Sequence, residues 1–307
     1  MAKLDLFVLT YNRADYLRQT LASIRAQTFT DYRLIVLDNA STDHTAEVVR
    51  EFGAEHRPTT ENIGGLPNLL RIKELAEADW VMSFHDDDLM HPQLLEALFR
   101  HIDTHPACTL AACNFLSSEA PEQDDFKTWT VTDAGWDFVN VAHLTSFCLT
   151  LNTVAFSSSI YRREAFLRMD PERYAPFGKI GDRPIMLDLC GEGTAFVLKD
   201  AYVNYRIHAG QDSSQGPGAD EIIAMTRYYR GLTGTSWKTP WGRSFIVNNR
   251  AFLKNLYKWS CDRPRMSFNR FVWRALKAGA CTRWVLVPRP LMRIVKKILR
   301  RRDPLFF

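Results

Sequence analysis

The sequence predicts an α/β fold with a mostly parallel sheet flanked by helices, followed by a helical and strongly basic C-terminal region. Over the first hundred residues, short apolar runs alternate with segments of helical periodicity, which is typical of βαβ units. Polar clusters follow the apolar runs, at the positions where ligands bind in such sheets. The chain has 307 residues, 46% of them hydrophobic and 24% charged, and is long enough to bury a substantial core.

The elements are assigned by the spacing of their apolar residues. The predicted strands of the first hundred residues are 4–12, 32–40 and 79–88, and the predicted helices are 14–28, 41–53, 62–78 and 92–102. Leu17, Leu21 and Ile24 fall on one face of the first helix. Ser41 and Thr42 are expected to cap the second helix. Further on, we expect a strand and short helix over 154–166, a loop and helix over 177–193, and strands with a polar loop over 194–214.

The distribution of charge divides the chain. Of its 39 Lys and Arg residues, 13 lie between Arg263 and Arg302, where no Asp or Glu occurs. The rest of the chain carries the other 26 against 35 Asp and Glu, a net charge of −9. We therefore expect a domain over 1–215 and a helical, basic region over 216–307.

The basic region is amphipathic. From about residue 290 onward, apolar residues recur at helical spacing with cations between them, which predicts a helix lying on an anionic membrane surface. A helix packed on the domain with a solvated basic face fits the same pattern, and nothing else in the sequence supports nucleic-acid binding. The N-terminal apolar run is short and no run of eighteen apolar residues occurs, so we expect neither a signal peptide nor a transmembrane helix. The six cysteines lack metal-binding spacing, which favours reduced thiols in the cytoplasm.

Three consecutive carboxylates follow the predicted strand that ends in WVMSF (80–84). Asp86, Asp87 and Asp88 repel one another when ionised, so the cluster calls for a cation. Carboxylate oxygens suit Mg²⁺ and Mn²⁺, and few protein carboxylates are needed when the substrate itself brings phosphates. A solvated turn is the alternative interpretation. The apolar strand before the cluster and the polar clusters at the other strand ends favour a metal and a nucleotide or another diphosphate.

Asp38 ends the second strand, where its carboxylate is positioned to accept hydrogen bonds from a nucleobase or ribose. The run 62–65, Asn-Ile-Gly-Gly, offers a tight turn and close approach of the backbone. Each of these signals is weak alone.

Together, the runs TYNR (10–13), VLDNASTDHT (36–45), NIGG (62–65) and FHDDDLMHP (84–92) resemble glycosyltransferase family 2, which has the GT-A fold. The resemblance is strong over about 4–105 and loose over about 106–215. It implies an inverting transferase that uses a nucleotide sugar and a divalent metal, Mn²⁺ or Mg²⁺. Many relatives have an acid where this chain has His85.

The resemblance also implies roles for particular residues. A nucleotide site is implied for Thr10, Tyr11, Asn12, Arg13, Asp38, Asn62, Gly64, Gly65, Asp86 and Asp87. Metal binding is implied for Asp86, Asp87, Asp88 and His208, of which Asp86 and Asp88 satisfy the D-x-D motif. Asp182 matches the family's general base, although the acid that usually precedes it is missing and a helix cap fits the sequence as well. Tyr11 also fits a packing role, and His208 a structural one.

We therefore expect a metal-dependent glycosyltransferase that moves a sugar, from a UDP-sugar donor, to a glycan or lipid-linked acceptor in bacterial surface polysaccharide synthesis. Enzymes of this family often act on lipid-linked acceptors, so we expect a cytoplasmic protein held peripherally at the inner face of the cell membrane. Two alternatives stay open, a catalytically silent sugar- or nucleotide-binding scaffold and a nucleotidyltransferase. The latter lacks support, because TYNRADY (10–16) has no glycine-rich basic character to hold a triphosphate.

Overall fold

The computed structural model describes residues 2–118, 131–150, 152, 154–191, 193–208 and 216–302. The chain forms two compact units. Unit 1 takes Met1–Phe138, Val154–Pro171 and Asp188–Ala209, and unit 2 takes Val139–Thr153, Glu172–Leu187 and Gly210–Phe307. Most of the polar loop expected before residue 214 lies outside the described residues. The division into domains at residue 215 stays a prediction.

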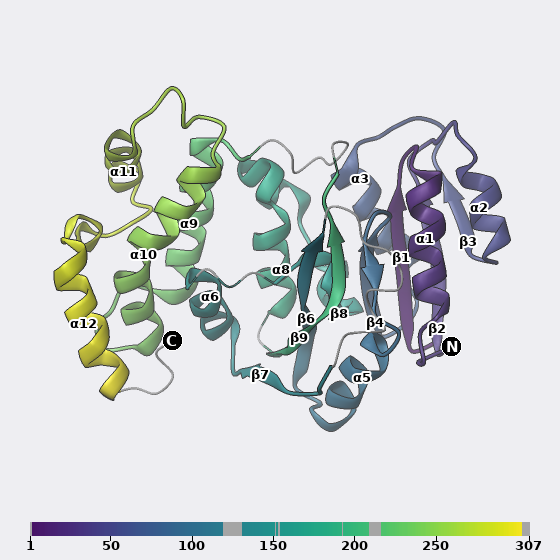
Figure 1. Ribbon diagram of the computed structural model, residues 1–307, viewed down its shortest axis with the longest axis horizontal. Coiled ribbons are helices and arrows are strands. Elements are labelled where there is room, and N and C mark those ends of the chain that lie inside the picture. The colour runs from purple at the N-terminus through teal and green to yellow at the C-terminus, as the bar shows by residue number, and fades with distance from the viewer. Residues whose placement is uncertain are drawn as a thin grey trace. The chain divides into compact units, whose positions relative to one another are not determined.

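Unit 1 is an α/β assembly (Figure 1). Its strands are β1 (Leu4–Thr10), β2 (Tyr32–Asp38), β3 (Glu55–Pro58), β4 (Trp80–His85), β5 (Leu89–Met90), β6 (Cys108–Ser118), β7 (Gly135–Phe138), β8 (Ser159–Arg162) and β9 (Thr194–Arg206). Its helices are α1 (Ala14–Arg25), α2 (Thr45–Glu51), α3 (Gly65–Leu70), α4 (Ile72–Leu75), α5 (Leu94–Thr104) and α7 (Arg163–Leu167), with a 3₁₀ turn at Phe156–Ser158.

The described strands form one sheet in the order β3-β2-β1-β4-β8-β6-β9-β5, and β7 pairs with β9. The neighbours β3, β2, β1 and β4 are parallel, as the sequence predicts for βαβ units. Beyond β4 the sheet is mixed, because β8 runs antiparallel to both β4 and β6 while β6 and β9 are parallel. The parallel half places the ends of β1, β2 and β4 at one edge. The last residue of β9, Arg206, bonds Asp88 in the turn after β4.

Hydrophobic burial explains these elements. Leu17, Leu21 and Ile24 on α1 are fully buried, which confirms the predicted apolar face. They pack in one core with the apolar residues of β1, β2, β4 and α5. Burying a side chain of this size stabilises the fold by about 1.5–3 kcal/mol, so this face ties α1 firmly to the sheet.

Unit 2 is largely helical. It contains α6 (Val141–Leu149), α9 (Ala219–Thr233), α10 (Pro240–Trp259), α11 (Phe268–Lys277), a 3₁₀ turn at Arg283–Leu286 and α12 (Arg289–Arg302). Helix α10 contacts α6, α9, α11 and α12 and is the centre of this unit. The 3₁₀ segment (Pro171–Ile180) and α8 (Asp182–Cys190) each have residues assigned to both units. Within the described part of the chain, no helix has both the length and the apolar character needed to span a bilayer.

The expectation that Ser41 and Thr42 cap α2 is wrong. Helix α2 begins later, at Thr45. The Ser41 hydroxyl instead accepts the backbone N–H of Asn12 at 2.9 Å, and the Thr42 N–H donates to the Asn12 side chain at 2.7 Å. These bonds join the loops after β1 and β2, an outcome that local capping preferences do not predict.

Candidate active site

Three polar loops meet at the carboxyl end of the parallel strands. The register pairs Thr10 of β1 with Asp38 of β2, and Leu9 with His85 of β4. The TYNR, DNASTD and HDDD runs therefore leave the sheet at the same edge, as the sequence analysis expects. Asn12 and Ala40 adopt left-handed φ angles of 51° and 66° in the first two loops. Such strain costs about 1–2 kcal/mol for Ala, and it is concentrated at functional sites.

The three aspartates lie in the turn after β4 and all are buried. Arg13 lies between the first two, with its Nη1 at 3.2 Å from Oδ1 of Asp86 and 3.0 Å from Oδ2 of Asp87. The Nε2 of His208 is 2.9 Å from the same Asp87 oxygen. The structure thus brings together four of the predicted site residues, Arg13, Asp86, Asp87 and His208, from the loops that follow β1, β4 and β9. Burial of unpaired carboxylates is costly, and these contacts offset part of that cost.

Asp88 has the least exposed side chain of the three, with no accessible surface. Its Oδ1 accepts the backbone N–H of Arg206 at 3.2 Å, and its Oδ2 accepts the hydroxyl of Ser157 at 3.1 Å. Burial raises the pKa of Asp88 to about 7, against the influence of His85 and with a further contribution from Asp87. Burial likewise raises the pKa of Asp86. Without a bound cation, ionising Asp86 and Asp88 costs free energy, because burial opposes their charged forms.

This raised pKa predicts how Asp88→Asn changes stability with pH in metal-free buffer. Between its ordinary pKa of 3.8 and about 7, Asp88 is protonated when folded and ionised when unfolded. The contribution of Asp88 to the free energy of unfolding therefore falls as the pH rises through this window, by at most about 1.4 kcal/mol per pH unit. Above about pH 7, this contribution no longer changes with pH. Because asparagine does not titrate, the variant should gain stability relative to wild type between pH 5 and pH 8.

Urea unfolding with EDTA at several pH values measures this gain. Asp103→Asn, which alters an exposed carboxylate paired with Lys3, serves as the control and should show no comparable gain. A stability difference between Asp88→Asn and wild type that does not change with pH would contradict the raised pKa.

The side chains fit a divalent metal. One ligand atom each from His85, Asp87 and Asp88 lies within 4.8 Å of the others. Carboxylate oxygens suit Mn²⁺ and Mg²⁺, and an imidazole nitrogen suits a transition metal, so the set fits Mn²⁺ better than Mg²⁺. The sequence analysis did not predict His85 as a ligand. A signal was present, because His85 stands where many relatives have an acid. Asp86 pairs with Arg13, and His208 bonds Asp87, which places both next to this set.

The Arg206 side chain holds the turn that contains Asp86, Asp87 and Asp88. The sequence analysis did not predict Arg206 as a site residue. Its buried guanidinium donates to the backbone carbonyl of Asp87, to Oε1 of Gln19 at 2.6 Å and to the carbonyl of Tyr16 at 3.2 Å. The Thr20 hydroxyl of α1 contacts the Asp86 and Asp88 carbonyls at 2.8 and 2.9 Å. These bonds tie the turn to α1 and β9, which holds the aspartates in place.

The second loop presents Asp38, which is buried at the end of β2. Its Oδ1 accepts the Ser41 N–H at 2.8 Å, and its Oδ2 is 2.9 Å from Nε2 of His56 on β3. Asp43 accepts the N–H of Ala14, which begins α1, and of Thr45, which begins α2. Burial opposes its charged form, but these bonds and the Thr45 hydroxyl lower the pKa of Asp43. Asp43 therefore anchors both helix starts.

The predicted Gly-rich turn has the expected geometry. The Asn39 side chain donates to Oδ1 of Asn62 at 2.9 Å and accepts the N–H of Ile63 at 2.9 Å. Gly64 has a φ of 87°, which favours glycine, and α3 begins at Gly65. The turn is thereby fixed to the loop after β2, beside Asp38. Asn39 is a further residue that the sequence analysis did not single out.

Tyr11 and Asp182 are among the predicted residues that have exposed side chains. Tyr11 is 44% exposed, which suits a surface for stacking more than a core contact. Asp182 belongs to unit 2, where it is exposed at the first residue of α8. Its role as a base stays a prediction.

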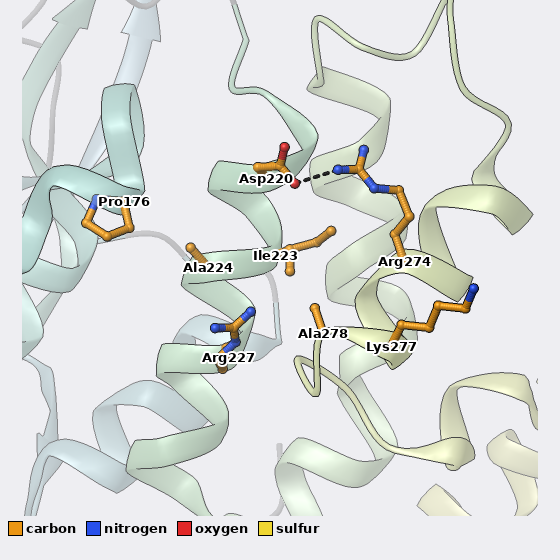
Figure 2. A pocket seen from close by; sticks show the side chains of 8 residues that line it. All are labelled: Pro176, Asp220, Ile223, Ala224, Arg227, Arg274, Lys277 and Ala278. Atoms are coloured by element: carbon orange, nitrogen blue, oxygen red, sulfur yellow. Dashed lines mark hydrogen bonds and ion pairs between the residues drawn. The ribbon is translucent and has the colours of Figure 1, made fainter.

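Unit 2 also contains an open pocket of about 680 Å³ beside α9 and α11 (Figure 2). Arg274 donates to Asp220 across it at 2.6 Å, so one of its cations is already paired. Lys277 extends away from α9 in this view. The described lining of this pocket includes no group of buried carboxylates like that of Asp86, Asp87 and Asp88, so the aspartate site is the better candidate.

The comparisons with known proteins agree with this geometry. Residues 5–168 match the family model described as Glycosyl transferase family 2. The chain is 28% identical over 113 residues to poly(ribitol-phosphate) beta-N-acetylglucosaminyltransferase TarS of Staphylococcus aureus, which covers 34% of this chain and 20% of TarS. It is 29% identical over 137 residues to abequosyltransferase RfbV of Salmonella typhimurium, 40% of each chain. The chain therefore spans between a fifth and two fifths of these relatives.

Solved structures share the fold. The structure of S. aureus TarS residues 1–349 with UDP-GlcNAc matches with a TM-score of 0.58 at 17% identity, over 91% of this chain and 89% of that one. The mannosyltransferase PcManGT from Pyrobaculum calidifontis, solved with GDP-Man and Mn²⁺, matches with a TM-score of 0.53 at 15% identity, over 99% and 82%. These matches confirm the predicted GT-A fold. Because the family model covers just over half of the 307 residues, the chain belongs to glycosyl transferase family 2.

Proposed function

We propose that this protein is an inverting glycosyltransferase that moves a sugar from a nucleotide sugar to a glycan or lipid-linked acceptor in bacterial surface polysaccharide synthesis. The observation that carries the proposal is the buried aspartate turn beside Arg13 and His208, at the same sheet edge as Asp38 and the 62–65 turn. This edge offers acceptors for a nucleoside at one end and acidic ligands for a metal diphosphate at the other. TarS and RfbV are named as sugar transferases, which supports the class of reaction.

Each part of the site has a role in this proposal. Asp38 accepts hydrogen bonds from the nucleoside, with Asn62, Gly64 and Gly65 forming a neighbouring wall. Asp87 and Asp88, with His85, hold the metal, which when bound acts as a Lewis acid on the diphosphate. Arg13 and His208 position the Asp87 carboxylate. Thr10, Tyr11 and Asn12 line the nucleotide from the β1 side, and Asp86 keeps Arg13 in place.

The chemical step needs a base and a leaving group. Asp182 removes the proton from an acceptor hydroxyl while the hydroxyl oxygen attacks C1 of the sugar, on the face opposite the diphosphate. The bond from C1 to the diphosphate oxygen breaks, and the nucleoside diphosphate leaves with the electron pair. The configuration at C1 is inverted as a result.

Calorimetry of nucleotide binding tests the proposal. UDP, GDP, CDP and dTDP are titrated into the protein, each with Mn²⁺, with Mg²⁺ and with EDTA. We expect one nucleotide, UDP, to bind in the presence of Mn²⁺ and to bind far more weakly with EDTA. If none of the four binds under any condition, a catalytically silent scaffold becomes the better interpretation.

The proposal includes association with an anionic membrane through α12. On one side of this helix, Met292, Val295 and Leu299 pack in a cluster with Val247 of α10. On the other side, Leu291, Ile294 and Ile298 are at least 50% exposed, and Arg293 and Lys297 are also exposed. A helix with one buried and one exposed apolar stripe, interleaved with cations, suits a bilayer interface. Each cation near an anionic surface contributes roughly 1 kcal/mol.

Replacing Leu291 and Ile294 together by serine should weaken binding to anionic lipid vesicles by roughly tenfold or more, because about half of each side chain is available for burial in the membrane. Cosedimentation with phosphatidylglycerol vesicles measures this loss, and phosphatidylcholine vesicles should bind neither protein. Leu116→Ser, at an equally exposed leucine of unit 1, should bind like wild type. Equal binding of the double variant and wild type would count against this surface.

A further inference from the structure

Arg13 links the group of candidate metal ligands to the carboxylate beside it. The group consists of His85, Asp87 and Asp88, and one ligand atom of each lies within 4.8 Å of the others. The Nη1 atom of Arg13 is 3.0 Å from Oδ2 of Asp87, which belongs to this group, and 3.2 Å from Oδ1 of Asp86. Hydrogen bonds between charged groups are roughly twice as strong as neutral ones. One carboxylate that suits the metal is therefore already paired with a cation of the chain itself.

Burial strengthens this pairing. The side chains of Asp86 and Asp87 are only 4% and 9% exposed, and the side chain of Arg13 is 25% exposed. Charges interact more strongly where water is largely excluded, so a guanidinium beside a buried carboxylate weakens the attraction of that carboxylate for a second cation. The Nε2 atom of His208 lies 2.9 Å from the same Asp87 oxygen. Any cation that binds Asp87 must therefore compete with groups that already hold this carboxylate.

The charges of the chain nearly balance at this turn. When ionised, Asp86, Asp87 and Asp88 carry three negative charges, against two positive charges on Arg13 and Arg206. The Arg206 guanidinium donates to the backbone carbonyl of Asp87 and interacts electrostatically with all three carboxylates. The remaining charge of about −1 attracts a divalent cation far less than the three carboxylates would attract it without their arginines.

The two arginines differ in how firmly their side chains are held. The Arg206 side chain is buried and donates to Gln19 and to the backbone carbonyl of Tyr16. Arg13 precedes α1, and its backbone carbonyl accepts the N–H of Leu17 at 2.9 Å, so the helix fixes its backbone. The Arg13 side chain is more exposed than that of Arg206, and rotation about its bonds moves the guanidinium without moving the backbone. Arg13 is thus better placed than Arg206 to exchange one anionic partner for another.

We propose that Arg13 competes with the divalent metal for Asp87, and that its guanidinium pairs with the diphosphate when metal and nucleotide are both bound. This inference rests on the proposed function and names the residue that couples its metal to its nucleotide. Guanidinium groups bind phosphate oxygens through two parallel N–H bonds, and a diphosphate carries enough negative charge to pair with both cations. The chain then binds the metal weakly by itself and tightly only together with a nucleoside diphosphate. Because coupling is reciprocal, the metal raises the affinity for the nucleotide by the same factor.

Binding of Mn²⁺ alone gives the first half of the test. Mn²⁺ is titrated into metal-free protein without nucleotide, and electron paramagnetic resonance measures the Mn²⁺ that stays free. We expect Arg13→Gln to bind Mn²⁺ at least roughly tenfold more tightly than wild type, because a repulsion between like charges is lost. Arg13→Lys keeps the positive charge and should bind Mn²⁺ as weakly as wild type. Asp87→Asn should lose this binding, which assigns the signal to the aspartate site.

Calorimetry of UDP in saturating Mn²⁺ gives the second half. Here Arg13→Gln should bind UDP at least roughly tenfold more weakly than wild type, since it lacks the guanidinium that pairs with the diphosphate. Arg13→Lys should have an intermediate affinity, because an ammonium keeps the charge but cannot bind two phosphate oxygens in parallel. The two effects of Arg13→Gln have opposite signs, whereas a general disruption of the turn would weaken both kinds of binding.

The matched control is Arg18→Gln, at an arginine of α1 whose side chain is 43% exposed and pairs with Glu51. It should leave both affinities unchanged. The proposal would be overturned if folded Arg13→Gln bound Mn²⁺ no more tightly than wild type. Wild type offers a test that needs no variant, because an affinity for UDP that is the same with Mn²⁺ and with EDTA would also overturn it. Failure of the proposed function is a different result, in which wild type binds no nucleotide at all.

Discussion

Asp87→Asn will lose metal-dependent nucleotide binding and lower sugar transfer by roughly a thousandfold. Its carboxylate lies between Arg13 and His208 and belongs to the candidate metal group with His85 and Asp88. Asparagine keeps the size of the side chain but removes the charge that holds the cation. A metal contributes several kcal/mol to stabilising a leaving diphosphate, and about 4 kcal/mol corresponds to a thousandfold in rate.

Calorimetry with UDP and Mn²⁺, together with transfer of radiolabelled sugar, measures both losses. Asp87 is a better target than Asp88, because Asp88 is wholly buried and its replacement also changes stability. Asp15→Asn, at an exposed aspartate on α1, is the matched control and should behave like wild type. The metal assignment would be wrong if Asp87→Asn bound UDP with Mn²⁺ as tightly as wild type.

Asp182→Asn will lower kcat by about 10²–10⁴ while leaving nucleotide binding unchanged. This range is the typical contribution of a general base to a rate. The exposed position of Asp182 at the first residue of α8 makes the carboxylate accessible to a substrate, and asparagine preserves its size but cannot take a proton. The expected signature is a fall in kcat without a change in the Kd for UDP.

Asp188→Asn, on the same helix, is the control and should retain activity and nucleotide binding. An acidic residue at the start of α8 also stabilises the helix, so thermal unfolding of Asp182→Asn must be measured together with the kinetics. A stable variant with wild-type kcat would exclude Asp182 as the base. Loss of both stability and UDP binding would indicate a structural role.

The candidate site was predictable in part. The strand-end positions of the TYNR, DNASTD and HDDD runs placed Arg13, Asp38 and Asp86–Asp88 at one edge, and the parallel register of β1, β2 and β4 confirms that these runs leave the sheet together. The cap assigned to Ser41 and Thr42 was wrong, because bonds to Asn12 from another loop compete with local capping. Arg206 was missed for a related reason, since a buried arginine in an apolar strand has no distinctive local pattern.

By itself, the sequence determined the alternation of strands and helices, the acidic turn after a buried strand, and the concentration of basic residues near the C-terminus. These properties are local, because burial on one face imposes periods of 2 and 3.6 along the chain. Only the tertiary structure decided that Ser157 and Arg206 support Asp88, and that Arg13 lies between Asp86 and Asp87. Such contacts depend on the order in which distant strands pair, and apolar periodicity carries no information about that order.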